Sequence, residues 1–137
     1  MTNPDQPPTP PALSLTSIRI GSSQPMVLAE FYEKFFGRPA DLQYGVFHVW
    51  AGAGGQVRVS DHSDLAAQAQ EPGRILINFD TARVQEEFER LKALGVTVIK
   101  EPYLMGGGYW VATLADPDGN LVQLTSPLDI PAARPKN

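Results

Sequence analysis

The stretch Val27-Leu28-Ala29-Glu30-Phe31-Tyr32-Glu33-Lys34-Phe35-Phe36-Gly37 is echoed further along the chain by Val84-Gln85-Glu86-Glu87-Phe88-Glu89-Arg90-Leu91-Lys92-Ala93-Leu94-Gly95. In both, Val is followed by Glu and Phe three and four residues later, and an apolar helical face ends at Gly. Each stretch follows one short strand-like run and precedes several more, which predicts a duplicated strand-helix-strands module. Two such modules facing each other would form a cleft, where small molecules bind.

The composition narrows the class of protein. The chain has 137 residues, an ordinary length for one domain that buries roughly two thirds of its unfolded surface. Its formal charge of -4 gives no electrostatic reason to expect nucleic acid or anionic membranes as partners. It has no apolar run near the roughly 20 residues that cross a bilayer, and no Cys for a disulfide or a Cys-bound zinc ion. We therefore expect a soluble, cytoplasmic protein.

Prolines mark the ends of the folded part. Five of the 13 prolines lie between Thr2 and Pro11, and Pro131 and Pro135 lie in the last residues. These stretches offer little to bury, so we expect a disordered arm over 1–11, a single domain over 12–130 and a flexible tail over 131–137. Polar residues ending in Pro72-Gly73 indicate a linker over 63–73. The linker separates module one, about 12–62, from module two, about 74–130.

Strand patterns surround each predicted helix. Residues 13–20 alternate apolar and polar side chains, so Ile18 and Ile20 would face the core and Arg19 the opposite side. Three strands are expected after the first helix, over Asp41–Tyr44, Val46–Ala51 and Gln56–Ser60. In module two, a strand over Arg74–Asp80 precedes the helix, and strands over Val96–Lys100, Tyr109–Ala115 and Asn120–Thr125 follow it. The pattern predicts an α+β fold.

Motifs at these spacings resemble those of a known superfamily. They are Phe31-Tyr32-Glu33-Lys34-Phe35-Phe36-Gly37, Leu91-Lys92-Ala93-Leu94-Gly95-Val96, Glu101-Pro102, Gly106-Gly107-Gly108 and the turn Asp116-Pro117-Asp118-Gly119-Asn120. Together they resemble the vicinal oxygen chelate superfamily, which includes glyoxalase I, bleomycin-resistance proteins, extradiol dioxygenases and fosfomycin-resistance enzymes. The resemblance covers almost all of the folded part. It implies two βαβββ modules whose curled mixed sheets enclose a shared cavity, often in a homodimer.

The resemblance also implies where a divalent metal would bind. Relatives use His, Glu or Gln from the first and last strands of each module, and these positions fall here on Ser17, Arg58, Leu76 and Gln123. Leu has no donor atom, Arg is a permanent cation and Ser is a poor ligand, so only Gln123 suits a metal. We therefore predict a divergent member that lacks the usual metal site and has no cofactor.

Several other side chains are candidates for a ligand site. Arg19 and Arg58 could hold a carboxylate, phosphate or enolate-like oxygen, or could form structural ion pairs. His48 could act as a general base or ligand anchor, or could be a hydrogen-bonded structural histidine. Further candidates are the aromatic residues Trp50, Tyr103 and Trp110, which could line a pocket, and the amides Asn78 and Gln123, which could orient a ligand.

Three functions remain open from the sequence. The first is a metal-independent protein, related in behaviour to drug-sequestering relatives, that binds a small and, to suit the arginines, anionic organic molecule. The alternative is a lyase, isomerase or dioxygenase-type enzyme of the same superfamily that uses His48 and Arg58 or a relocated metal site. A purely structural partner-binding module is a third, weaker reading.

Overall fold

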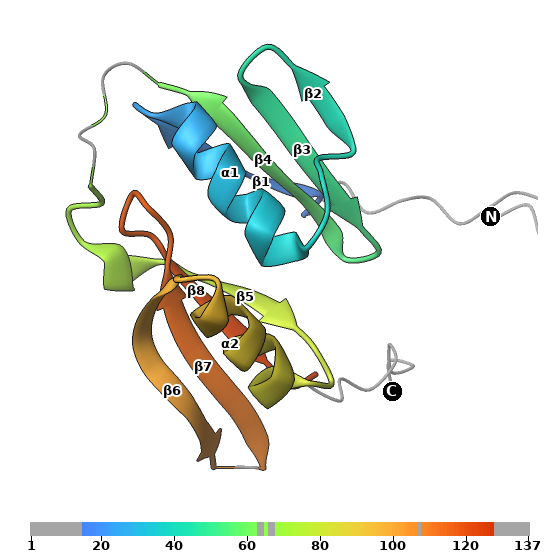
Figure 1. Ribbon diagram of the computed structural model, residues 1–137, viewed down its shortest axis with the longest axis vertical. Helices are drawn as coiled ribbons and strands as arrows, with labels where there is room; N and C mark the ends of the chain where they lie inside the picture. Colours follow the sequence, from blue (N-terminus) through green and yellow to red (C-terminus); the bar gives the residue numbers. More distant parts are fainter. Residues whose placement is uncertain (1–14, 63–64, 66–67, 107, 128–137) are drawn as a thin grey trace, which may run out of the picture.

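The computed structural model describes residues 15–62, 65, 68–106 and 108–127 (Figure 1). The predicted arm, the predicted tail and parts of the predicted linker lie outside these residues. Within them, neither helix is long and apolar enough to cross a bilayer.

Module one has the predicted order of elements. Strand β1 (Ser17–Ser22) precedes helix α1 (Pro25–Phe36), and strands β2 (Leu42–Tyr44), β3 (Phe47–Gly52) and β4 (Gly55–Asp61) follow it. They form sheet A in the order β1-β4-β3-β2, with β1 parallel to β4 and the other pairs antiparallel.

Module two repeats this arrangement. A short 3-10 helix, η1 (Pro72–Arg74), leads into strand β5 (Leu76–Asp80) and helix α2 (Val84–Ala93). Strands β6 (Thr97–Met105), β7 (Tyr109–Ala115) and β8 (Leu121–Thr125) complete sheet B, whose order β5-β8-β7-β6 matches that of sheet A. The predicted α+β fold of two βαβββ modules is therefore confirmed. The resemblance implied sheets that enclose a shared cavity, but the two sheets do not close on each other, and strands β1 and β5 each pair on one side only.

The echoed stretches are the two helices. Pro25 begins α1, where the amide it lacks would have no partner. Gly37 ends α1 with a left-handed φ of 72°, and its amide donates to the carbonyl of Glu33 at 2.9 Å. Gly95 has a φ of 86° after α2. The repeated glycine therefore terminates the helix in both modules.

Each helix covers one face of its sheet, and Figure 1 shows both helices on the same side of the molecule. One hydrophobic core runs through both modules. Phe79 of β5 joins them, with its ring 4.6 Å from the ring of Phe35 and 5.4 Å from that of Phe36. We call the face of each sheet opposite its helix the helix-free face.

Candidate functional site

A row of four side chains crosses the helix-free face of sheet A. Residues paired directly across strands point to the same face. Arg19 of β1 pairs with Arg58 of β4, Arg58 with Val49 of β3, and Val49 with Leu42 of β2. The row therefore runs from two cations to two apolar side chains. Ser17 shares this face through its pairing with Gln56.

Neutral acceptors hold both guanidinium groups of the row. Nε of Arg19 donates to Oγ of Ser60 at 2.9 Å, and Nε of Arg58 donates to Oε1 of Gln56 at 3.0 Å. The Arg19 guanidinium also lies 6.0 Å from the centre of the Phe47 ring, within range of a cation–π contact. Neither arginine is in an ion pair with a described carboxylate.

Module two has an equivalent row without the cationic pair. Matching β4 to β8 places Gln123 where module one has Arg58, and the partner of Gln123 is Asn78, where module one has Arg19. Gln123 donates from Nε2 to Oγ1 of Thr113 at 3.0 Å. Tyr103 lies on the same face through its pairing with Val111, and Lys100 lies 4.2 Å above its ring.

His48 and the two tryptophans lie on the helix-covered side. His48 pairs with Val59 and stacks on Trp50 at 6.0 Å, and Trp50 stacks on Phe36 of α1 at 5.6 Å. His48 is buried, and its Nδ1 lies 3.0 Å from the carbonyl oxygen of Val46. Trp110 packs against the same core. His48 and Arg58 therefore occupy opposite faces of sheet A, and the structure does not bring them into one site.

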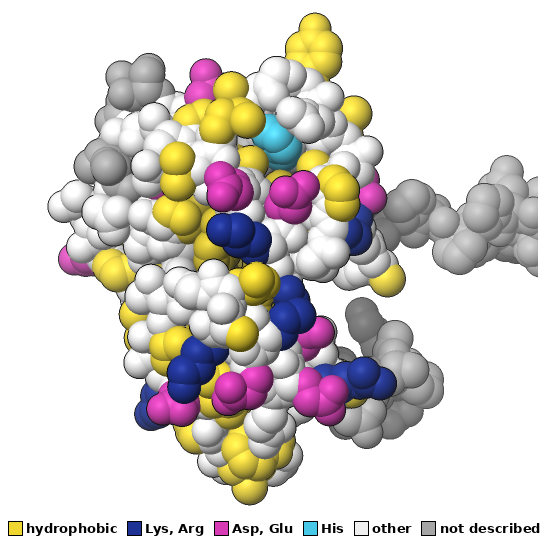
Figure 2. Space-filling view, in the orientation of Figure 1, with side chains coloured by type: hydrophobic (Ala, Val, Ile, Leu, Met, Phe, Trp, Pro, Cys, Tyr) yellow, Lys and Arg dark blue, Asp and Glu magenta, His cyan; other side chains and the backbone are white. Residues whose placement is uncertain are grey.

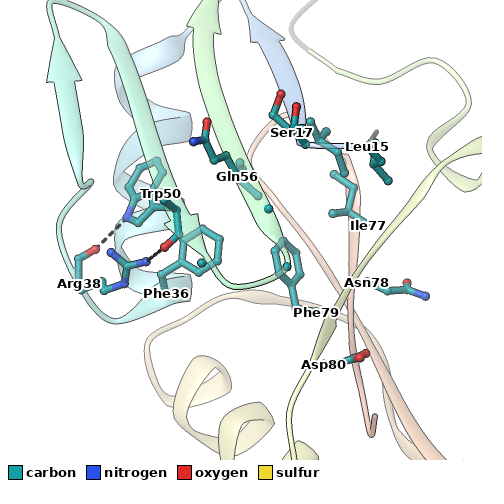
Figure 3. Close-up of a pocket in the computed structure, with 17 residues that line it drawn as sticks. Leu15, Ser17, Phe36, Arg38, Trp50, Gln56, Ile77, Asn78, Phe79 and Asp80 are labelled. Carbon is teal, nitrogen blue, oxygen red and sulfur yellow. Dashed lines mark hydrogen bonds between the residues drawn. The ribbon is translucent and has the colours of Figure 1, made fainter. Parts of the chain in front are cut away.

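A pocket of about 550 Å³ opens between sheet A and strand β5. It gathers three predicted site residues, Ser17 from β1, Trp50 from β3 and Asn78 from β5. In Figure 3 the β5 residues lie across the pocket from Gln56 and Trp50. The rest of the lining includes the apolar residues Ile18, Phe36, Val57, Ile77 and Phe79, the polar residues Arg38, Gln56 and Asp80, and the glycine-rich β3–β4 hairpin.

The sequence reasoning missed Gln56, Asp80 and Arg38 as lining residues. Gln56 and Asp80 lie two residues from Arg58 and Asn78, so strand alternation could have placed them on the same faces. Arg38 gave no such signal. Its carbonyl accepts a 3.0 Å hydrogen bond from the Trp50 indole. Its guanidinium pairs with Asp41 at 2.6 Å, and this hydrogen bond lowers the pKa of the Asp41 carboxyl.

A model of a known protein family matches most of the chain. Residues 15–124 match the family model described as the glyoxalase/bleomycin resistance protein/dioxygenase superfamily. The chain belongs to this superfamily. No curated protein matches the chain.

Solved structures share the fold of the chain. A glyoxalase/bleomycin resistance protein/dioxygenase family enzyme from Burkholderia phytofirmans PsJN has a TM-score of 0.67 and 20% identity, over 85% of this chain and 100% of that one. Lactoylglutathione lyase from Agrobacterium tumefaciens has a TM-score of 0.66 and 20% identity, over 85% of this chain and 96% of that one. TioX from Micromonospora sp. ML1 has a TM-score of 0.65 and 18% identity, over 84% of this chain and 99% of that one. At these identities the similarity shows the fold alone.

The residues at the superfamily's metal positions do not fit a divalent cation. Ser17, Arg58 and Gln123 lie on the helix-free faces, but the Arg58 guanidinium would repel a cation. Leu76, at the fourth position, has no donor atom. In the part of the chain that the structure describes, no three His, Asp or Glu side chains gather closely enough to hold a metal ion elsewhere.

Proposed function

We propose that the protein binds a small organic anion, with the body of the molecule in the pocket between sheet A and β5, and without the superfamily's metal. The observation that carries this proposal is the pocket itself. Its volume of about 550 Å³ lies within the roughly 300–1,000 Å³ that small-molecule sites occupy. Its lining combines aromatic and aliphatic walls with a few polar side chains, which is the usual make-up of such sites.

Binding in this pocket needs no metal because other groups can hold a ligand. Trp50, Phe36 and Phe79 supply apolar contact. Gln56, Asn78 and Asp80 supply donors and acceptors that fix orientation. Arg58 and Leu76, at two of the superfamily's metal positions, supply no metal ligand. The side chains that line the pocket would therefore contact the ligand directly.

We also propose that the protein is a homodimer, as its relatives in the superfamily often are. Apolar side chains are exposed on the outer strands of both sheets, including Leu42 and Tyr44 on β2 and Ile99 and Leu104 on β6. A second copy that covers these strands would remove this surface from water and close the open sides of the sheets. Light scattering coupled to size exclusion tests this, and a monomer at micromolar concentration would contradict it.

Metal content and ligand binding test the proposed function together. Purified protein is analysed for transition metals and is then screened by thermal shift against small aromatic carboxylates and phosphates, with and without EDTA. A ligand at 100 times its Kd stabilises the fold by about 2.7 kcal/mol, which is a readily measured rise in Tm. We expect hits that EDTA does not change. One tightly held metal per chain, whose removal abolishes the hits, would refute the proposal.

A pocket-filling variant shows where the hits bind. Ala51 lines the pocket, whereas Ala53 lies in the same hairpin outside the lining. Ala51→Trp should abolish the thermal shifts, and Ala53→Trp should leave them unchanged. Equal loss in both variants, or in neither, would place the ligand elsewhere.

A further inference from the structure

Arg19 and Arg58 face each other directly on neighbouring strands. Like charges in this position destabilise a sheet unless something neutralises them. The chain has 15 acidic residues against 11 basic ones, so carboxylates are not scarce. A bound anion would therefore relieve the repulsion between the two cations.

The other described arginines are all in ion pairs with carboxylates. Each pairs with a carboxylate within four residues, and the pairs are Arg38 with Asp41, Arg74 with Glu71, Arg83 with Glu86 and Arg90 with Glu87. On the side shown in Figure 2, Lys and Arg side chains likewise lie beside Asp and Glu. Among the described residues, Arg19 and Arg58 are the two arginines that no carboxylate neutralises.

The two guanidinium groups are also held in place. Each uses Nε to reach its neutral acceptor, Ser60 for Arg19 and Gln56 for Arg58. The terminal nitrogens, which form the fork that binds a carboxylate or phosphate through two hydrogen bonds, make no hydrogen bond to a described residue. Because the side chains are already ordered, less entropy is lost when an oxyanion binds.

Gln56 connects this pair to the pocket. It lines the pocket together with Ser17, its partner across the strands, and it holds Arg58 through its side chain. We propose that Arg58 binds the oxyanion of the ligand, a carboxylate or a phosphate monoester, and that the charge of Arg19 on the neighbouring strand adds to the attraction, while the apolar body of the same molecule enters the pocket beside Gln56. The placement of the body rests on the proposed function; the anion site does not.

Nitrogen–proton NMR of the arginine Nε–H groups tests the anion site directly. Benzoate, phenyl phosphate and neutral benzamide are titrated into the protein. We expect saturable shifts of the Arg19 and Arg58 signals with at least one of the two anions and none with benzamide, and the anion with the lower Kd identifies the preferred group. Arg58→Gln and Arg19→Gln should each raise the Kd at least about tenfold. Arg74→Gln, which removes the same charge from an exposed ion pair, should not change it.

The outcomes separate this inference from the proposed function. Equal binding of benzamide and benzoate, or wild-type affinity for both anions in both arginine variants that remain folded by circular dichroism, overturns the anion site. Saturable anion shifts that persist in Ala51→Trp support the anion site and show that the body of the ligand lies outside the pocket.

Discussion

The phenol of Tyr32 in α1 donates a 2.8 Å hydrogen bond to the carboxylate of Asp116 in module two. Both side chains are buried, and Asp116 also accepts from the amides of Asp118 and Asn120 and from the Asn120 side chain, each at 2.9 Å. Gln24, at the start of α1, donates to Asp118 at 2.7 Å. The turn between β7 and β8 is therefore one of the places at which α1 is held to module two.

Tyr32→Phe should lower the free energy of unfolding by about 1–3 kcal/mol, because a buried carboxylate loses one donor. Tyr44→Phe is the matched control, since that phenol is 82% exposed. Urea unfolding measures both. A Tyr32→Phe variant as stable as Tyr44→Phe would show that the hydrogen bond does not stabilise the fold.

Asp116 should make stability depend on pH. Burial raises the pKa of Asp116 above its ordinary value, although its hydrogen bonds to Asn120 and Tyr32 oppose the shift. A folded carboxyl with a raised pKa favours folding most below the ordinary pKa of about 4, and this contribution is lost as pH rises through the folded value. The free energy of unfolding of the wild type, minus that of Asp116→Asn, should therefore shrink as the pH rises above about 4. A constant or growing difference in urea titrations would contradict the assignment.

Arg90→Gln should destabilise the contact between the helices. Arg90 of α2 donates to the carbonyls of Lys34 and Phe35 at 2.8 and 2.7 Å, and so caps the last turn of α1. We expect a loss of about 1–3 kcal/mol in the free energy of unfolding. Arg83→Gln, whose side chain is exposed and pairs with Glu86 at 3.9 Å, should cost less than about 0.5 kcal/mol. Equal unfolding midpoints for the two variants would rule out a special role for Arg90.

Gly119→Ala should cost about 1–2 kcal/mol, because Gly119 has a left-handed φ of 81°. An added Cβ would also lie 2.8 Å from Oε1 of Gln68, which would have to move. Gly73→Ala is the control, since it has no positive φ and no neighbour within 4 Å of an added Cβ. Thermal unfolding of both variants checks this, and a Tm for Gly119→Ala at or above the control would contradict it.

Local patterns predicted the order of the elements, although β6 extends to Met105, beyond the predicted strand Val96–Lys100. The 3.6-residue period and the closing glycines defined both helices. Alternation placed Arg19 and Ile20 on opposite faces of the sheet. The turn at Asp116–Asn120 followed from Pro117 and Gly119, and the amide of Gly119 donates to Asp116 as expected. These features depend on neighbours in sequence, so sequence alone was sufficient.

The site was harder to predict because it depends on distant contacts. Alternation gives the face of Arg58 but not its register, so the direct pairing with Arg19 could not be foreseen. Alternation puts His48 on the same face as Trp50, but only the packing of Trp50 on Phe36 of α1 shows that this face is the helix-covered one. The pocket needs β5 beside sheet A, and that arrangement follows from how Phe79 packs on α1.

The equivalent rows of the two modules differ in one respect. Arg19 and Arg58 occupy the places that Asn78 and Gln123 hold in the repeat. Backbone symmetry alone would let an elongated molecule bind in either of two head-to-tail orientations with similar energy. Two cationic side chains in one half and two neutral amides in the other would give such a molecule a single preferred orientation.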